Sequence, residues 1–329
     1  MAATADLLRL VRKGVDVRSV HAHTRKPFRF YLCGDPALVA SLRRLMLAGH
    51  PGDEIPDDAA ATLETIVPGV LQTSIAAEAR AIVFLGRGGD VNAATIAPLR
   101  TLNLPIIAIT VEENATPSGP ASPPARGAYA EYIVPALTRE ALRGRVFPHL
   151  VECAKGVEIA VGRRLPPLRE SVAAKLTRDA ANNALKVSLA SAVIDHIPIV
   201  GLVAGVVASA GDMIAITGIQ MMLMVQIEAA YGKDPDVQRL WQLLPVIGGG
   251  FGWRTLAREL SGFIPLAGIG MKGAIAYAGT IVVGEGVTFY YEHGRHMSAA
   301  QTRARYEQTK AEAVAFARDL LAKVTKPKE

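Results

Sequence analysis

The most apolar stretch of the chain reads Ile197-Pro-Ile-Val-Gly-Leu-Val-Ala-Gly-Val-Val-Ala-Ser-Ala-Gly-Asp212 and continues as Met213-Ile-Ala-Ile-Thr-Gly-Ile-Gln-Met-Met-Leu-Met-Val-Gln226. Asp212 is the only ionisable side chain between Ile197 and Val225. A helix that is apolar on every side belongs in the core of a helical domain or in lipid. The stretch therefore predicts a large helical core or a membrane helix.

Three polar side chains in this stretch help to separate the two possibilities. At about 100° per residue, Asp212, Gln220 and Gln226 fall within an arc of about 120° on a helix. A polar stripe on an otherwise apolar helix faces partners or a cavity rather than acyl chains. The uninterrupted pieces on either side of Asp212 are shorter than the roughly 20 residues that cross a bilayer, although a window that includes Asp212 would cross. The pattern favours membrane insertion or tight membrane association, with a fully soluble helical bundle as the alternative.

A second stretch repeats the start of the first. Ile197-Pro-Ile-Val-Gly201 is echoed by Ile264-Pro-Leu-Ala-Gly268, and each opens a helix rich in Gly and Ala. Proline suits the first turn of a helix, where its missing N–H is not needed. Small residues recur every four positions and let two helix backbones approach closely. These predicted helix-packing residues are Gly201, Gly205 and Ser209 in the first helix and Gly270, Ala274 and Ala278 in the second.

Composition narrows the class of protein. A chain of 329 residues suggests two domains, and 50% apolar residues with only 5% aromatics favour packed helices over a β-sandwich. The net charge of +6 suits an anionic membrane surface, and the absence of basic stretches interleaved with aromatics argues against nucleic acid. Cys33 and Cys153 are too few for a disulfide framework or a cysteine zinc site. The N-terminus lacks the apolar core of a signal peptide, so we expect the protein on the cytoplasmic side.

The first half alternates short apolar runs with helical patterns, which predicts a small parallel α/β sheet. A polar connector is expected at Val15–Lys26, and loops at His50–Asp58 and at Ala115–Arg126, the second mobile because of its prolines. The expected strands are Phe28–Gly34, Ala79–Gly86, Leu104–Val111 and Ala130–Val134; the expected helices are Ala37–Leu47, Val91–Leu102 and one from Thr138.

This order of strands and helices resembles a small GTPase domain. A P-loop needs Gly-x4-Gly-Lys-Ser/Thr after the first strand. Gly34 and Ser41 occupy the first and last of these positions, but Val39 and Ala40 replace the second Gly and the Lys. Thr110-Val-Glu-Glu113 occupies the guanine-reading Asn-Lys-x-Asp position, and no Asp-x-x-Gly magnesium motif is found. The resemblance implies a degenerate, non-hydrolysing GTPase relative; an ordinary α/β domain without a nucleotide site is the alternative.

The second half contains a series of short motifs in a fixed order: Asn182-Asn-Ala-Leu185, the turn at Ile197–Gly201, Ile219-Gln-Met-Met222, Ile227-Glu-Ala-Ala-Tyr-Gly232, the turn at Ile264–Gly268, Gly284-Glu-Gly286 and Tyr290-Tyr291. With these motifs the chain resembles, over about Pro166 to Gly294, the YcjF-type GTPase-associated helical domain of bacterial proteins. This resemblance implies a helical domain on or in the inner membrane, often fused to a GTPase domain, with no known reaction.

Other motifs do not predict a site, so we expect no catalytic residues and no metal. Gly268-Ile-Gly-Met-Lys-Gly273 matches a dinucleotide fingerprint but lies in a helical region, where it predicts close helix packing. His293 and His296 have a spacing that could hold a metal on a helix, but Gly294 weakens that helix, so a surface pair is favoured.

We therefore expect an α/β plus all-α protein, in which a small parallel-sheet GTPase-like domain is followed by a helical-hairpin bundle. The expected parts are an N-terminal helix and connector (1–27), the degenerate GTPase-like α/β domain (28–150), the apolar helical domain (151–297) and a charged C-terminal helix (298–329).

The expected function is that of a non-catalytic scaffold or interaction protein without a cofactor, held peripherally or partly inserted at the cytoplasmic side of the inner membrane. Its expected partners are the membrane or an anionic lipid surface, and a protein or a second copy of the chain, but not nucleic acid. One alternative is a weak switch that binds GTP and Mg²⁺ through the backbone of Gly34–Ser41. The other is a cytoplasmic, soluble helical interaction protein.

Overall fold

The computed structural model describes residues 16–67, 77–194, 204–236 and 269–325. The chain divides into two compact units. The sheet unit comprises His21–Lys175 and Ala229–Lys233. The helical unit comprises Leu176–Glu228 and Asp234–Glu329, together with the N-terminal residues up to Val20. The sheet unit continues past residue 150, as far as Lys175.

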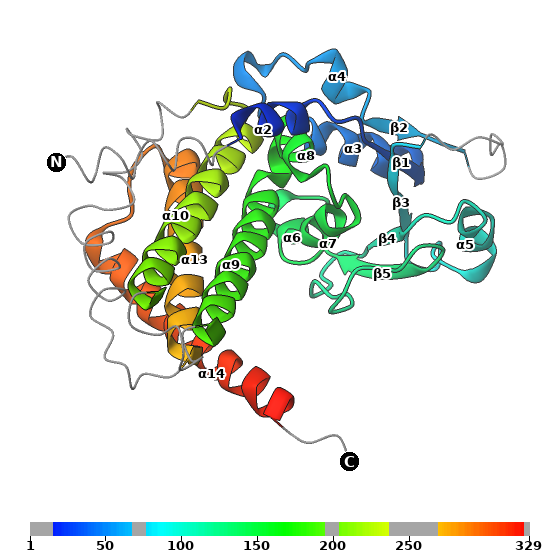
Figure 1. Ribbon diagram of the computed structural model, residues 1–329. Helices are drawn as coiled ribbons and strands as arrows, with labels where there is room; N and C mark the ends of the chain where they lie inside the picture. The colour runs from blue at the N-terminus through cyan, green and yellow to red at the C-terminus, as the bar shows by residue number, and fades with distance from the viewer. Residues whose placement is uncertain (1–15, 68–76, 195–203, 237–268, 326–329) are drawn as a thin grey trace. The chain divides into compact units, whose positions relative to one another are not determined.

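The sheet unit is built on five parallel strands in the order β2-β1-β3-β4-β5 (Figure 1). Four of them confirm the strands expected from the apolar runs, and the neighbouring pairs are all parallel. The strands are β1 (Arg29–Gly34), β2 (Leu63–Thr65), β3 (Ala79–Arg87), β4 (Ile106–Val111) and β5 (Tyr129–Val134).

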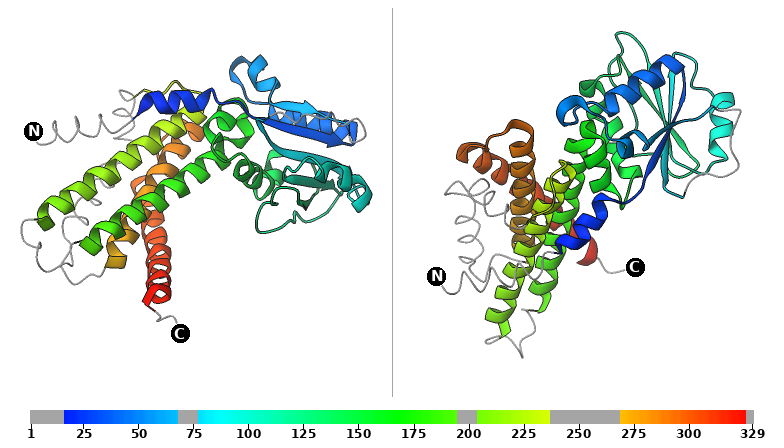
Figure 2. Two further views of the ribbon diagram at one scale, coloured as in Figure 1. Left: turned by 45° about the vertical axis from the view of Figure 1, so that its right-hand side comes forward. Right: turned by 90° about the horizontal axis from the view of Figure 1, so that it is seen from above.

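Helices cover both faces of the sheet (Figure 2). Alternate residues of β1 and β3 point to opposite sides, so Tyr31 and Ile82 pack with the residues of α5 while Leu32 and Val83 face α3 and α7. Burial on both sides explains why β3 and β4 read as continuous apolar runs. The helices of this unit are α2 (Val17–Thr24), α3 (Pro36–Met46), α4 (Asp57–Ala60), α5 (Ala93–Arg100), α6 (Arg139–Arg143), α7 (Val146–Cys153) and α8 (Glu158–Arg164), with α2 starting just before the unit's boundary.

Three local expectations were wrong. The polar connector at Val15–Lys26 contains α2, because the Asp16 carboxylate accepts from the Ser19 amide and starts a helix that buries Val20. The loop expected at His50–Asp58 contains the 3₁₀ turn η1 (Pro51–Asp53) and the first residues of α4. Strand β2 was not expected, because three residues are too few to show a periodicity.

The Pro-rich segment Ala115–Arg126 has no helix or strand, as expected, but it is tied to its surroundings. Ser118 and Ile133 exchange two backbone hydrogen bonds as an isolated antiparallel bridge, and Arg145 donates to the carbonyl of Pro120. The prediction that this segment is mobile did not anticipate these contacts.

The helical unit contains long helices that run side by side (Figure 1). Gln220 of α10 donates to Thr280 of α13, Gly284 of α13 lies against Thr177 of α9, and α14 packs on α13. The turns expected at Ile197–Gly201 and Ile264–Gly268 lie outside the described residues. The helices are α9 (Arg169–Ile194, preceded by the 3₁₀ turn η2 at Pro166–Leu168), α10 (Ala204–Ala230), α13 (Ile269–His293) and α14 (Ala299–Thr325).

The charged C-terminal helix buries Tyr306, Thr309 and Ala313. Ala304 and Ala311 are exposed. Arg305 of α14 also forms an ion pair with Glu285 of α13, donating twice to its carboxylate, each at 2.7 Å.

Among the helices of the described ranges, none combines the length and the apolar character needed to cross a membrane.

The contact between α9 and α13 makes a stability prediction. A Cβ on Gly284 would lie 2.1 Å from Thr177 Oγ1, whereas a Cβ on Gly286 would meet nothing within 4 Å. We expect Gly284→Ala to lower the free energy of unfolding by about 2 kcal/mol through overpacking, and Gly286→Ala to raise it by about 0.5 kcal/mol through helix propensity. Urea unfolding followed by circular dichroism checks both values.

Thr177→Ala in the Gly284→Ala background removes Oγ1 and Cγ2, the two atoms nearest the new methyl group. This double variant should recover part of the loss, which a double-mutant cycle measures. Equal effects of the two single glycine changes would contradict the close approach of α9 and α13.

Candidate functional site

Ligands of open parallel sheets bind beyond the carboxyl ends of the strands, at the point where the strand order reverses. In this sheet β1 lies between β2 and β3, so the order reverses between β1 and β3. The residues at this point are Gly34 at the end of β1 and Asp35 after it, and Arg87 at the end of β3 and Asp90 in the turn that follows. We call these four residues the β1–β3 corner.

The backbone at Gly34 is pressed against β3. Gly34 has a φ of +109°, and a Cβ there would lie 1.9 Å from the carbonyl oxygen of Leu85. The same oxygen accepts a hydrogen bond of 2.8 Å from the amide of Asp35. No L-amino-acid side chain fits at this place, so the turn from β1 into α3 accounts for the glycine.

The Asp35 carboxylate caps the N-terminus of α3. Its Oδ1 accepts from the amides of Ala37 at 2.8 Å and Leu38 at 3.1 Å, while Oδ2 lies 3.5 Å from Nε of Arg87. Pro36 begins the helix and has no N–H to offer. The hydrogen bond from Leu38 is the main cause that lowers the pKa of Asp35, helped by Ala37 and the charge of Arg87.

The structure does not arrange Gly34 and Ser41 as a P-loop would. A P-loop places a run of free amides between strand and helix, where they surround a phosphate. Here α3 begins at Pro36, directly after Asp35, and Ser41 is an exposed residue in its second turn. The segment between Gly34 and Ser41 is therefore helix, and a carboxylate lies at its N-terminus.

The other polar groups along this edge of the sheet bind each other. Asp90 Oδ2 accepts from the Arg87 amide at 2.7 Å. Thr110, at the position compared with a guanine-reading Asn, is buried and donates to the Glu131 carboxylate. Within the described ranges, no three His, Cys, Asp or Glu side chains gather in a way that could hold a metal ion.

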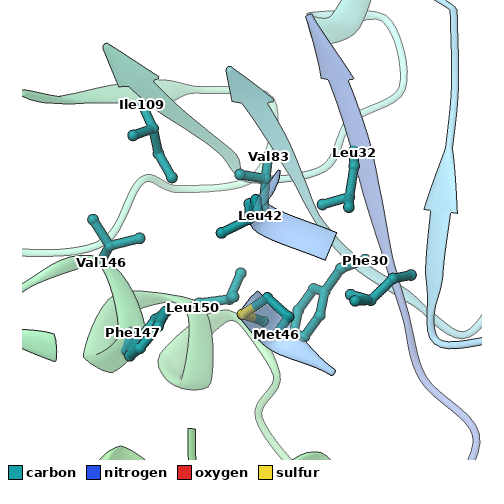
Figure 3. Close-up of a pocket in the computed structure, with 10 residues that line it drawn as sticks. Phe30, Leu32, Leu42, Met46, Val83, Ile109, Val146, Phe147 and Leu150 are labelled. Carbon is teal, nitrogen blue, oxygen red and sulfur yellow. The ribbon is translucent and has the colours of Figure 1, made fainter. Parts of the chain in front are cut away.

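A small cavity lies inside the sheet unit, between the sheet and helices α3 and α7 (Figure 3). It leaves about 10 Å³ of free space, the least that one water molecule needs. A void of this size without polar partners is a packing defect rather than a ligand site. All ten side chains that line it are apolar: Phe30, Leu32, Leu42, Met46, Leu63, Val83, Ile109, Val146, Phe147 and Leu150.

The predicted polar stripe of α10 is described in part. Gln220 is buried and its Nε2 donates to Thr280 Oγ1 at 3.3 Å, and that hydroxyl donates to the Ala276 carbonyl at 2.8 Å. Gln226 is half-buried, and Asp212 belongs to α10 but its side chain lies outside the described residues. The contact of Gln220 joins two helices of this unit, α10 and α13.

The predicted helix-packing residues are likewise described in part. Ala274 and Ala278 of α13 are completely buried, as close packing requires. Gly205 and Ser209 belong to α10 and Gly270 to α13, but their surroundings lie outside the described residues, as does Gly201.

Sequence reasoning missed a buried polar pair in the sheet unit. The hydroxyl of Tyr132 in β5 lies 2.7 Å from Nδ1 of His149 in α7, and both residues are buried. Burial raises the pKa of Tyr132 to about 12 and lowers that of His149. The only signal in the sequence is a histidine within an apolar helix, which does not identify its partner on a distant strand.

The remaining candidates are accounted for locally. Burial raises the pKa of Cys33 and of Cys153 to about 12, so neither thiol is activated as a nucleophile. His293 stacks on Phe289 and His296 stacks on Tyr290, so the two histidines rest on different rings.

Comparisons of the chain with protein-family models, with curated proteins and with solved structures found no match.

The β1–β3 corner makes a stability prediction with a matched control. Gly34→Ala places a methyl group against the Leu85 backbone, and we expect it to cost about 3 kcal/mol or to prevent folding. Gly52→Ala also has a positive φ, of +72°, but meets nothing within 4 Å. We expect it to cost about 1 kcal/mol. Thermal unfolding of both variants checks the difference, and similar losses would contradict the backbone contact.

The Asp35 cap makes a pH prediction. Since its folded pKa is lowered, the cap stabilises the fold above the unfolded pKa of about 3.9, and this stabilisation is lost as the pH falls through the folded pKa. The gap in urea midpoint between the natural protein and Asp35→Ala should therefore be larger at pH 7 than at pH 2.5. Glu113→Gln, an exposed change at the same edge, controls for net charge. An equal gap at both pH values would contradict the cap.

Proposed function

We propose that this chain is a non-catalytic scaffold or interaction protein that associates with a membrane from the cytoplasmic side. In this proposal the sheet unit is a GTPase-like domain that does not use a nucleotide. One observation carries the proposal: the Asp35 carboxylate binds the amides at the N-terminus of α3, where a phosphate would have to bind.

Charge strengthens this argument. A helix N-terminus binds phosphate through free amides and through the positive end of its dipole. Here an ionised carboxylate takes the amides of Ala37 and Leu38, and the nearest cation, Arg87, is close to that same carboxylate. A phosphate would have to displace Asp35 and then lie beside its negative charge. This disfavours the alternative of a nucleotide-dependent switch.

The GTPase-like reading of the sheet unit is part of the proposal. It is supported by a first strand that passes through a glycine directly into a helix, within a parallel sheet. The order β2-β1-β3-β4-β5 is also that of flavodoxin-like sheets, so strand order alone does not identify a GTPase relative.

Membrane association is supported by partly exposed apolar residues of α10, which recur every three or four positions. Ala215 is exposed, and Gly218, Ile219 and Met222 are half-buried. A Cβ added to Gly218 would meet nothing within 4 Å, whereas Ile219 packs in part against a buried cluster of the helical unit. A partly exposed apolar stripe on a helix is typical of a surface that contacts lipid or another protein. With a net charge of +6, we take the occupant to be an anionic lipid surface.

Vesicle flotation of the full chain tests this proposal. We expect the protein to float with vesicles that contain phosphatidylglycerol and much less with vesicles of phosphatidylcholine alone. Ala215→Glu should reduce flotation at least severalfold, because a charge enters the apolar stripe at an exposed position. Ala304→Glu adds the same charge to an exposed position of α14 and should have a small effect. No flotation with either vesicle would overturn the membrane role and leave a soluble interaction protein.

Calorimetric titration tests the loss of nucleotide binding independently. We expect no heat when GTP, GDP or ATP is added with Mg²⁺ to the full chain, because Asp35 keeps the amides of α3. Saturable binding at micromolar nucleotide would overturn the non-catalytic part of the proposal, whatever the flotation result.

A further inference from the structure

Cationic residues of the sheet unit follow the ends of three helices. Arg25 and Lys26 come after α2, Lys155 comes after α7 and Lys233 comes after α10. All four residues belong to the sheet unit, and we call them the basic patch. Arg25, Lys155 and Lys233 are exposed, and Lys26 is half-buried.

One hydrogen bond joins the first two of these segments. Nζ of Lys26 donates to the carbonyl of Gly156 at 3.2 Å, and Gly156 directly follows Lys155. The acceptor is a neutral backbone group, so this contact does not cancel the charge of the ammonium group. The positive charges after α2 and after α7 therefore lie on the same part of the surface.

Helix α8 brings in the third segment. Arg164 donates to the carbonyl of Lys26 at 3.0 Å, and its neighbour Arg163 donates to the carbonyl of Lys233 at 2.9 Å. Both arginines belong to the last turn of α8. The segments after α2, α7 and α10 are thus held around one short helix, although they are distant in the sequence.

The carboxylates around the basic patch bind other cations. Asp58 lies 2.7 Å from Arg164, and Glu158 lies 3.8 Å from Lys175. Within the described part of the chain, none of the four cations of the patch forms an ion pair. The charges of the patch are therefore not neutralised by salt bridges.

The helix ends and one acid offset only part of this charge. The C-terminal end of a helix carries about −0.5 of an elementary charge, so three such ends offset about 1.5 of the four positive charges. Asp234 directly follows Lys233 and offsets part of the remainder. Like charges that gather without partners repel each other and destabilise the compact chain. An anionic surface bound at the patch would remove this repulsion.

We propose that the basic patch binds the phosphate groups of an anionic lipid surface. This inference rests on the membrane association proposed above and assigns its electrostatic part to named residues of the sheet unit. The exposed side chains of Arg25, Lys155 and Lys233 are open to such a surface. Each Lys or Arg close to an anionic membrane strengthens binding about fivefold.

The aromatic rings beside the patch favour lipid over nucleic acid. Phe28 is 3% exposed and Tyr231 is 8% exposed. The guanidinium groups of Arg164 and Arg169 lie over these two rings, 5.7 and 5.8 Å from the ring centroids. Proteins that bind single strands stack the bases on open aromatic faces. These two rings are covered by the protein's own arginines, so the patch offers charges for phosphate without a ring for a base.

Sedimentation of the full chain with vesicles tests the patch. The vesicles contain phosphatidylcholine with increasing fractions of phosphatidylglycerol. Lys155→Gln combined with Lys233→Gln removes two exposed charges, and neither side chain holds another part of the described structure. We expect this double variant to bind phosphatidylglycerol vesicles about 25-fold more weakly than the natural protein. The difference should shrink at high salt, which screens exposed charges.

Arg44→Gln combined with Arg100→Gln is the matched control, because it removes two exposed charges of the sheet unit outside the patch. We expect this control to weaken binding by less than about threefold, since charges beyond a Debye length from the lipid are largely screened. Equal losses in the two double variants would overturn the patch, because net charge alone would then account for binding.

A measurement on the natural protein locates the contact without any substitution. Lysines of the vesicle-bound protein are acetylated, and the modified positions are identified by mass spectrometry. Lys155 and Lys233 should react at least severalfold more slowly with phosphatidylglycerol vesicles than with vesicles of phosphatidylcholine alone. Unchanged reaction rates of both lysines in the bound protein would overturn the patch.

The result can be separated from that of the proposed function. If the Lys155 and Lys233 double variant binds the anionic vesicles as well as the natural protein does, the patch is overturned and membrane association stands. If the natural protein binds no vesicles, membrane association and the patch both fail. If a mixed-sequence DNA or RNA binds more tightly than the vesicles, and the double variant loses that binding, lipid is overturned as the occupant of the patch.

Discussion

The close approach of the β1 and β3 backbones at Gly34 and Leu85 determines how the chain turns at the carboxyl edge of the sheet. Because Gly34 lies against the carbonyl of Leu85, the chain leaves β1 without room for a side chain and enters α3 within two residues. This short turn puts the Asp35 carboxylate, rather than a loop of free amides, at the N-terminus of α3. The ligand-binding corner of a parallel sheet is thereby occupied by the protein itself.

Around α8, polar groups from several segments of the sheet unit bind one another. Arg164 donates to the Asp58 carboxylate at 2.7 Å and to the Lys26 carbonyl at 3.0 Å, and its guanidinium lies over the Phe28 ring. Its own carbonyl meets His50 at 3.1 Å. One side chain thus ties the segment before β1 to α4, and these polar contacts serve the fold. Polar contacts of the helical unit, such as Gln220 with Thr280, act in the same way.

Much of the fold could be predicted from the sequence, because it depends on local patterns. The apolar runs of β1, β3, β4 and β5 and the helix α3 were expected at nearly their observed positions. For the candidate site, the sequence predicted only that a working P-loop is absent, because Ala40 stands where a P-loop has its lysine. The role of Asp35 could not be predicted, since it depends on where α3 begins and on the position of Arg87 on another strand.

The sequence by itself determined the alternation of strands and helices, the apolar character of α10 and the absence of a P-loop lysine at Ala40, because each is a property of neighbouring residues. Only the tertiary structure decided that β2 joins the sheet beside β1, that α14 buries Thr309, and that Tyr132 meets His149. These contacts join residues from different elements. Their energies depend on packing and burial that no periodicity within one segment encodes.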